Sequence, residues 1–197
     1  MESLANLAKI AKTHGGLIET GIAEKQGISR ALLSKMCKNG RIQRIAKGQY
    51  ILSDAIQDEL LSISKRSERI VFSHETALFL HGISIQTPFE HTVTAPSGCT
   101  PSAAIRSECK VFYIKPELFE VGKVTLRTPS GNPVPAYDLE RTICDVVRSR
   151  NRIGTEPFLE ALKRYAADSK KDLNRLDNYA KQLRVANILH QYLEILL

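Results

Sequence analysis

The sequence lacks the cysteine and histidine spacings that build zinc sites. Four cysteines are scattered along the 197 residues without a CxxC pair, and the five histidines form no HExxH motif. Zinc sites in proteins depend on such spacings to gather their nitrogen and sulfur ligands. Free cysteines usually behave as small buried hydrophobic residues. We therefore expect reduced, mostly buried thiols, no metal and no cofactor.

Long hydrophobic runs are also missing. No apolar run approaches the roughly 18 residues that a membrane-spanning helix requires. The first residues, MESLANLAKIAKTHGG, carry polar side chains every few positions, which is not the pattern of a secretory signal peptide. These absences predict a cytoplasmic protein without a membrane partner.

Nucleotide-binding and catalytic motifs are absent as well. The sequence contains neither GxxxxGK followed by Ser or Thr nor GxGxxG, the glycine-rich loops that hold phosphates. His74 and Glu75 begin a predicted helix, but adjacent helical side chains point about 100° apart and do not converge on one proton. We expect both side chains on the surface. No catalytic motif is recognisable, so the chain is not expected to be an enzyme.

Acidic residues are scarce only in the first quarter of the chain. Residues 1–50 contain nine Lys or Arg against three Asp or Glu, whereas the remainder contains 19 against 18. The net charge of +7 therefore arises almost wholly near one end. Residues 28–52 carry six cations and no acid. This asymmetry favours a polyanion-binding module joined to a near-neutral body.

Three short helices are predicted in the basic module. Apolar residues recur at helical spacing over residues 3–13. Thr20 is expected to cap a second helix of under two turns that Gly27 closes. Ser29 is a suitable N-cap for a third helix, from Arg30 to Lys38.

The third helix has two different faces, and a hairpin follows it. A helical wheel places Ile28, Leu32 and Met36 on one stripe, and Arg30, Ser34 and Lys38 on the opposite stripe, with Lys35 at its edge. The segment RIQRIAKGQYIL predicts a two-stranded hairpin that turns at Lys47-Gly48. Three helices followed by a basic hairpin are the order of a winged helix-turn-helix, which places a helix in the major groove of DNA.

Residues 1–53 are therefore predicted to bind double-stranded DNA. Lys and Arg neutralise phosphates, while side chains of the exposed helix stripe contact base edges. An RNA-binding role is not favoured, because no aromatic stacking platform is visible. The predicted contacts are Ser29, Arg30, Ser34, Lys35, Lys38, Arg41, Arg44 and Lys47.

The remaining residues are predicted to form a linking helix over residues 54–67 and an α+β domain over 68–197. Ile56, Leu60 and Ile63 mark the expected buried side of the linking helix. Beyond it, HTVTAP, KVFYI and KVTLRTP have the composition of strands, and the chain is expected to be helical from Asp138 onward. The sequence thus predicts an α+β fold.

Four segments, in order, resemble the AbiEi-type antitoxins of the AbiE abortive-infection systems. They are NGRIQRIAKGQYIL, SHETALFLHGI at 73–83, HTVTAP at 91–96 and AYDLERTICDVVR at 136–148. The resemblance implies a repressor that binds inverted repeats in the promoter of its own operon, with two protomers per operator. It also implies an antitoxin domain that opposes a nucleotidyltransferase toxin in phage defence. Such systems are classed as type IV, so a stable complex with the toxin is not expected.

The roles of two sets of charged residues within residues 68–197 remain open. Arg141 and Asp145 match the family's Glu-Arg-Thr-x-x-Asp segment, but an i,i+4 ion pair that stabilises the helix explains them as well. Arg148, Arg150 and Arg152 form a basic run that extends the DNA contact or engages the toxin or its RNA substrate. Two other functions stay open: a plain repressor whose second domain senses a ligand or dimerises, and an enzyme that modifies the toxin.

Overall fold

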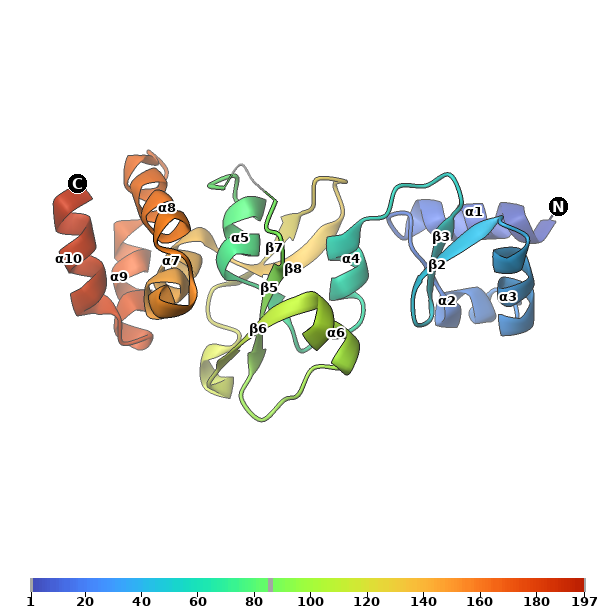
Figure 1. The fold of residues 1–197 in the computed structure, drawn as a ribbon, viewed down its shortest axis with the longest axis horizontal. Coiled ribbons are helices and arrows are strands. Elements are labelled where there is room, and N and C mark those ends of the chain that lie inside the picture. The colour runs from blue at the N-terminus through green and yellow to red at the C-terminus, as the bar shows by residue number, and fades with distance from the viewer. Residues whose placement is uncertain (1, 85–86, 197) are drawn as a thin grey trace. The chain divides into compact units, whose positions relative to one another are not determined.

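The computed structural model describes residues 2–84 and 87–196, and the chain forms two compact units. The first unit extends to Arg66 and includes Arg127–Pro133 from later in the sequence. The second unit contains Ser67–Leu126 and residues 134 onward. Each unit combines helices with a sheet of its own, so the fold is α+β as predicted (Figure 1).

The first unit has four helices and a three-stranded sheet. Its elements are α1 (Glu2–Thr13), β1 (Ile18–Glu19), α2 (Thr20–Lys25), α3 (Arg30–Lys38), β2 (Ile42–Ala46), β3 (Gln49–Leu52) and α4 (Glu59–Ser64). The strands pair antiparallel in the order β1-β3-β2. The expected hairpin is confirmed, and Gly48 supplies the positive φ of +75° that its tight turn requires.

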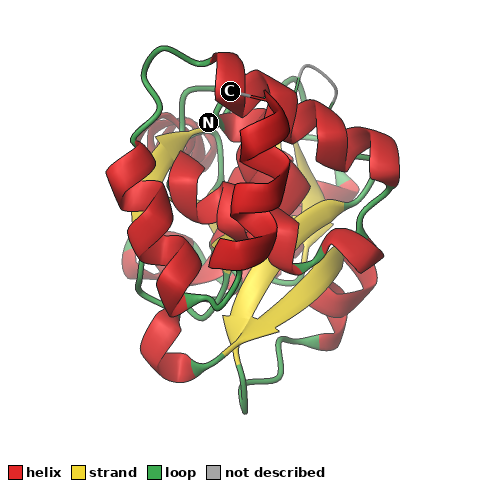
Figure 2. Ribbon diagram, turned by 90° about the vertical axis from the view of Figure 1, so that its left-hand side faces the viewer, coloured by secondary structure: helices red, strands yellow, loops and turns green. Residues whose placement is uncertain are grey.

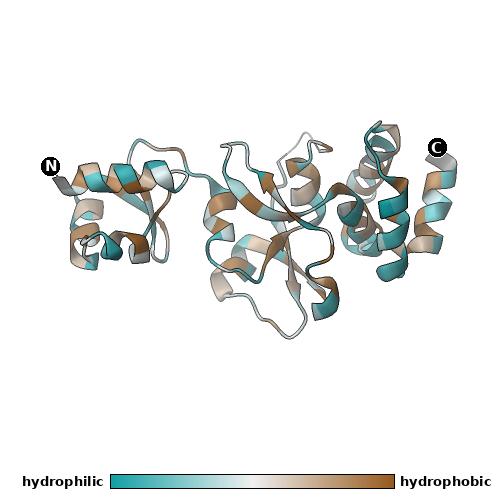
Figure 3. Ribbon diagram, turned by 180° about the vertical axis from the view of Figure 1, so that it is seen from behind, coloured by the Kyte–Doolittle hydropathy of each residue, from teal (hydrophilic) through white to brown (hydrophobic). Residues whose placement is uncertain are grey.

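Amphipathic helices build the core of this unit. Leu7 and Ile10 of α1 are fully buried, and they pack with Leu33 and Met36 of α3. In the hydropathy colouring of Figure 3, the helix beside the N label shows both hydrophobic and hydrophilic faces. The predicted boundaries of α3 are confirmed, and the hydroxyl of Ser29 caps it by accepting a hydrogen bond from the backbone N–H of Leu32 at 3.2 Å.

The short helix α2 begins one residue earlier than predicted. Glu19 occupies the N-cap position, and Thr20 is the first helical residue. The hydroxyl of Thr20 donates instead to the carbonyl of Gly48 at 3.2 Å. Strand β1, which the sequence did not indicate, precedes α2 and pairs with β3. The turn of the hairpin is therefore fixed to the start of α2.

The expected linking helix is much shorter than residues 54–67. Only Glu59–Ser64 is helical, with Asp58 as the N-cap. Leu60 and Ile63 are buried as predicted, but Ile56 is 92% exposed because it precedes the helix.

A loop from later in the chain completes the first unit. The side chain of Asp58 accepts hydrogen bonds from Thr128 at 2.6 Å and from Asn132 at 2.7 Å. Asn132 also donates to the carbonyl of Gly15 at 3.1 Å. These polar contacts bind the loop Arg127–Pro133 to the first unit, although more than 60 residues separate it from Asp58 in the sequence.

The second unit contains a five-stranded sheet in the order β6-β5-β4-β8-β7. The first elements are β4 (Val71–Phe72), α5 (His74–Leu80), β5 (His91–Pro96), α6 (Ala103–Glu108), β6 (Cys109–Ile114) and the 3-10 helix η1 (Pro116–Leu118). The elements that follow are β7 (Lys123–Arg127), β8 (Pro133–Tyr137), α7 (Leu139–Arg148), the 3-10 helix η2 (Arg150–Arg152), α8 (Thr155–Ala167), α9 (Leu173–Gln182) and α10 (Ala186–Leu196). Strand β4 pairs antiparallel with β5 and parallel with β8, while β5 and β6 are parallel.

Helix α7 is the centre of this unit. It contacts α5, α8, α9 and α10, and the last four helices pack together (Figures 1 and 2). Eight of its ten residues are buried, including Arg141 and Asp145. Ile143 and Val147 join the large apolar core with Leu162 of α8.

Among residues 2–84 and 87–196, no helix combines the length and apolarity that crossing a bilayer requires.

Candidate functional site

The residues predicted to bind DNA are all exposed in the first unit. We call this set the basic surface; it comprises Ser29, Arg30, Ser34, Lys35, Lys38, Arg41, Arg44 and Lys47. Arg30, Ser34 and Lys38 lie on the face of α3 opposite to the buried Leu33 and Met36. Helix α3 packs against β2, so the helix and the hairpin are adjacent.

One member of the basic surface has an acidic partner that the sequence did not indicate. The guanidinium of Arg30 forms a bidentate pair with Glu24 of α2, at 2.8 and 3.3 Å. The side chain of Arg30 is 77% exposed, and exposed pairs of this kind contribute little to stability. Within the part of the chain that the structure describes, Lys35, Lys38, Arg41 and Lys47 form no ion pair. The basic surface therefore retains an excess of free positive charge.

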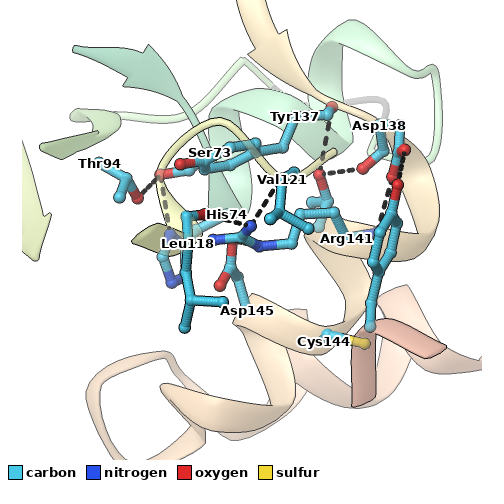
Figure 4. Close-up of polar contacts among 12 residues, drawn as sticks. Ser73, His74, Thr94, Leu118, Val121, Tyr137, Asp138, Arg141, Cys144 and Asp145 are labelled. Atoms are coloured by element: carbon cyan, nitrogen blue, oxygen red, sulfur yellow. Dashed lines mark hydrogen bonds and ion pairs between the residues drawn. The ribbon is translucent and has the colours of Figure 1, made fainter. Parts of the chain in front are cut away.

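The second candidate cluster surrounds Arg141 in the interior of the second unit (Figure 4). Nε of Arg141 donates to Asp145 at 3.0 Å, and Nη1 donates to the backbone carbonyls of Leu118, at 2.9 Å, and Val121. The guanidinium lies 4.2 Å from the centre of the Tyr137 ring. Arg141 is fully buried, so it binds three segments of the fold together and does not present a contact surface.

The carboxyl of Asp145 is equally enclosed. Burial raises its pKa, while the positive charge of Arg141 and the hydrogen bond from it act in the opposite direction. Asp138 caps α7 by accepting from the backbone N–H of Arg141 at 2.8 Å, and it also accepts from the hydroxyl of Tyr179 at 2.9 Å. The burial of Arg141 and Asp145 supports a helix-stabilising ion pair as their role, and not a contact with a partner.

The backbone at Gly122 leaves no room for a side chain beside Arg141. It has a φ of +76°, and a Cβ added there would lie 2.7 Å from Cβ of Arg141. We expect Gly122→Ala to lower the free energy of unfolding by about 2 kcal/mol or more, because overlap adds to the backbone strain. Gly98→Ala is a matched control, since Gly98 has a φ of +84° with open space around it. In urea denaturation, we expect Gly98→Ala to lower the free energy of unfolding by no more than about half as much as Gly122→Ala. Equal losses in the two variants would contradict a contribution from the overlap with Arg141.

A chain of hydrogen bonds runs through His74, which contradicts its expected place on the surface. The imidazole is 2% exposed; Nδ1 lies 2.9 Å from Oγ of Ser73 and Nε2 lies 3.0 Å from Oγ of Ser149. The hydroxyl of Thr94 donates to Ser73 at 2.8 Å. We call these four residues the hydroxyl–imidazole chain. The His74 ring also stacks on Phe112, with 3.6 Å between ring centres.

A pocket of about 310 Å³ opens beside this chain. Its lining residues are His74, Thr94, Phe112, Tyr113, Asp145, Arg148, Ser149, Asn151 and Arg152. Arg148 and Arg152 are exposed, whereas Arg150 is half-buried and donates to the carbonyl of Val147 at 3.3 Å. The structure thus brings two of the three predicted arginines to one pocket and leaves Arg150 outside its lining.

Sequence inspection missed most of this pocket. Ser73, Thr94 and Ser149 are ordinary residues in the sequence, and no spacing relates them to Phe112. Of the lining residues, the sequence predicts Asp145, Arg148 and Arg152 as candidate contacts.

The burial of His74 predicts a pH-dependent stability. Desolvation, and then the charges of Arg152 and Lys110, hold the pKa of His74 well below its usual 6.5. A depressed pKa means that the unfolded chain binds the proton more readily. The stabilising contribution is therefore complete above about pH 6.5 and is lost as the pH falls below it.

Urea denaturation tests this prediction at two pH values. Between pH 7.5 and 5.5, we expect the wild type to lose about 1 kcal/mol more than His74→Gln, which cannot titrate. An equal loss in the two proteins would contradict the prediction.

The described residues contain no group of three His, Cys, Asp or Glu side chains that could hold a metal ion. None of the four cysteines forms a disulfide; Cys109 and Cys144 are buried as expected, while Cys37 and Cys99 are half-buried.

Comparison with known proteins identifies the fold alone. No protein-family model matches the sequence, and no curated protein matches it. The crystal structure of the RV2827C protein from Mycobacterium tuberculosis has a similar fold, with a TM-score of 0.70 and 14% sequence identity. The similarity covers 95% of this chain and 75% of that one.

Proposed function

We propose that the first unit binds double-stranded DNA as a winged helix-turn-helix and represses transcription. The observation that carries this proposal is the basic surface, whose eight residues are exposed on α3 and its flanking turns and hairpin. The order α1, α2, α3 and hairpin agrees with that architecture, in which the helix before the hairpin enters the major groove.

The dimensions and side chains of α3 suit this role. An α-helix with its side chains is roughly 10–12 Å in diameter, which fits a major groove about 12 Å wide. Arg30, Ser34 and Lys38 follow one another along its exposed stripe, so they are placed to contact base edges. Arg41, Arg44 and Lys47 are suited to phosphates, because their charge releases counterions without reading sequence.

The second unit is proposed to act as the antitoxin part of a toxin–antitoxin operon, opposing a nucleotidyltransferase toxin. This part rests on the resemblance to the AbiEi-type antitoxins at 73–83, 91–96 and 136–148. Two protomers per operator follow from inverted repeats, since each copy of the protein reads one half-site. A stable complex with the toxin is not part of the proposal.

A specific observation also favours a ligand-sensing role for the second unit. The pocket beside His74 is lined by arginines and hydroxyls and lies against buried residues of α7. Ligand binding there would give a repressor that responds to a small molecule, whether or not a toxin is opposed.

Fluorescence anisotropy tests the DNA-binding proposal. The probe is the duplex upstream of the gene, and the controls are the same duplex with one repeat scrambled and a random duplex, all at one salt concentration. We expect specific binding about 10³-fold tighter than to the random duplex, with two protomers per intact site. Equal affinity for all three duplexes would contradict sequence-specific repression.

Co-expression tests the antitoxin proposal. The neighbouring nucleotidyltransferase gene is induced in cells with and without this protein. Restored growth supports the proposal, and growth arrest with the protein present contradicts it.

A further inference from the structure

We infer that the pocket lined by Ser149, Arg148 and Arg152 binds a phosphate group, either as inorganic phosphate or as part of a small phosphate monoester. The inference concerns the second unit and goes beyond the proposed DNA-binding function. It accounts for Arg148 and Arg152 of the basic run, which neither the basic surface nor the core explains.

The charges around the pocket favour an anion. Arg148 and Arg152 line it, and Lys110 of β6 lies at its edge, where Nζ donates to the carbonyl of Arg152 at 2.6 Å. Asp145 is the single carboxylate in the lining, and Arg141 already pairs with it. Among the described residues, the ion pairs leave Arg148, Arg152 and Lys110 without a carboxylate partner. Two positive side chains, Arg148 and Arg152, therefore line the pocket, and a third, Lys110, lies beside Arg152.

Two of these cations are held in position by an aromatic ring. The guanidinium of Arg152 lies 4.3 Å from the centre of the Phe112 ring, and Nζ of Lys110 lies 5.6 Å from the same centre. Their location over one ring limits the side-chain entropy that anion binding would cost. Arg148, the last residue of α7, adds a planar guanidinium that suits a phosphate.

The hydroxyl–imidazole chain supplies a neutral donor to the same pocket. Ser149 is half-buried in the lining, and its hydroxyl contacts Nε2 of His74. His74 in turn contacts Ser73, which accepts from Thr94. When Ser73, which accepts from Thr94, directs its own proton to Nδ1 of His74, the neutral imidazole carries its proton on Nε2 and donates it to Ser149. The hydroxyl proton of Ser149 is then available to a bound oxygen.

The backbone at His74 is strained, which is common at ligand sites. His74 has a φ of +48°, in the left-handed region that bulky residues rarely adopt. The position begins α5 and fixes the imidazole between Ser73 and Ser149. Strain of this kind persists when the surroundings enforce it, and it clusters at binding sites.

The size of the pocket sets the class of ligand. A volume of about 310 Å³ lies at the lower end of the range for small-molecule sites. Tyr113, 43% exposed in the lining, offers an aromatic face beside the cations. Inorganic phosphate would contact the cations alone, whereas a nucleoside monophosphate would also contact the Tyr113 ring. Comparing the affinities of the two ligands therefore shows which of them the pocket binds better.

Isothermal titration calorimetry on the full chain provides the test, with inorganic phosphate and AMP as the probes. We expect saturable binding with one site per chain, weakened about tenfold by Arg148→Gln and by Arg152→Gln, since each removes one charge-assisted contact. Both side chains are exposed, so the fold should survive, and circular dichroism checks that it does. Tighter binding of AMP than of phosphate would identify the nucleotide as the source, and equal binding would identify phosphate alone.

Two controls locate the binding. Arg164→Gln removes a positive charge from α8 in the same unit, and Lys38→Ala with Lys47→Ala weakens the basic surface. Both proteins should bind the probes like the wild type. In NMR spectra, the bound phosphate should also raise the pKa of His74, because a nearby anion favours the protonated imidazole. Loss of binding in the Lys38 and Lys47 variant, unchanged binding in the Arg148 and Arg152 variants, or no binding at millimolar concentrations would overturn the inference.

Discussion

Arg141→Met is expected to lower the free energy of unfolding of the second unit by about 3–5 kcal/mol. The substitution keeps much of the side-chain volume but removes the charge that compensates Asp145. It also removes the donors to the carbonyls of Leu118 and Val121. A buried carboxylate and two partly buried carbonyls then lose the partner that Arg141 provides, and each such group costs free energy.

Urea denaturation followed by tyrosine fluorescence measures this loss, because five of the six tyrosines lie in the second unit and tryptophan is absent. Arg164→Met is the matched control, since its i,i+4 pair with Glu160 is exposed and should change stability by about 0.5 kcal/mol or less. The double variant Arg141→Met with Asp145→Leu should lose less than the two single losses together, because it leaves no unpaired charge. A loss of under about 1 kcal/mol for Arg141→Met would show that the pair does not stabilise the fold.

Replacing Lys35, Lys38, Arg41 and Lys47 together by Ala is expected to weaken DNA binding by about 10³-fold at about 0.15 M salt. Each phosphate contact contributes about 0.9 to the dependence of log K on log salt, so four contacts contribute nearly three powers of ten at that concentration. These side chains are exposed and take part in no ion pair of the described chain, so the first unit should fold normally.

A variant with an equal loss of charge is the control for this prediction. Lys9 and Lys12 on α1, with Lys163 and Lys170 in the second unit, are four exposed lysines outside the basic surface. Their replacement by Ala should weaken binding far less, through the smaller general attraction alone. Similar losses in the two quadruple variants would mean that net charge, and not the basic surface, drives DNA binding.

Local patterns in the sequence are sufficient to predict the helix and the hairpin that carry the basic surface. A capping serine and a clear apolar stripe define α3, and the Lys47-Gly48 turn defines the hairpin. The predicted linking helix is too long because Ile56 fits the helical spacing of Leu60 and Ile63, although Asp58 caps a helix that begins only at Glu59. Helical spacing alone does not reveal a cap inside the pattern.

Local patterns in the sequence do not predict contacts between residues that are far apart in the chain. His74 was placed on the surface because its spacing to Glu75 carries no information about Ser149, 75 residues away. No local pattern in the sequence indicates that the loop near Asn132 completes the first unit by binding Asp58 and Gly15. Arg141 and Asp145 were recognised as an i,i+4 pair, while their burial depends on helices that pack around α7 later in the chain.

The salt dependence of promoter binding is the most direct test of the account. Affinity is measured by anisotropy at several salt concentrations for the wild type and for the Lys35, Lys38, Arg41 and Lys47 variant. Contact between the basic surface and phosphates predicts that the slope of log K against log salt becomes shallower by about three to four in the variant. Equal slopes for the two proteins would show that these side chains do not touch the DNA backbone.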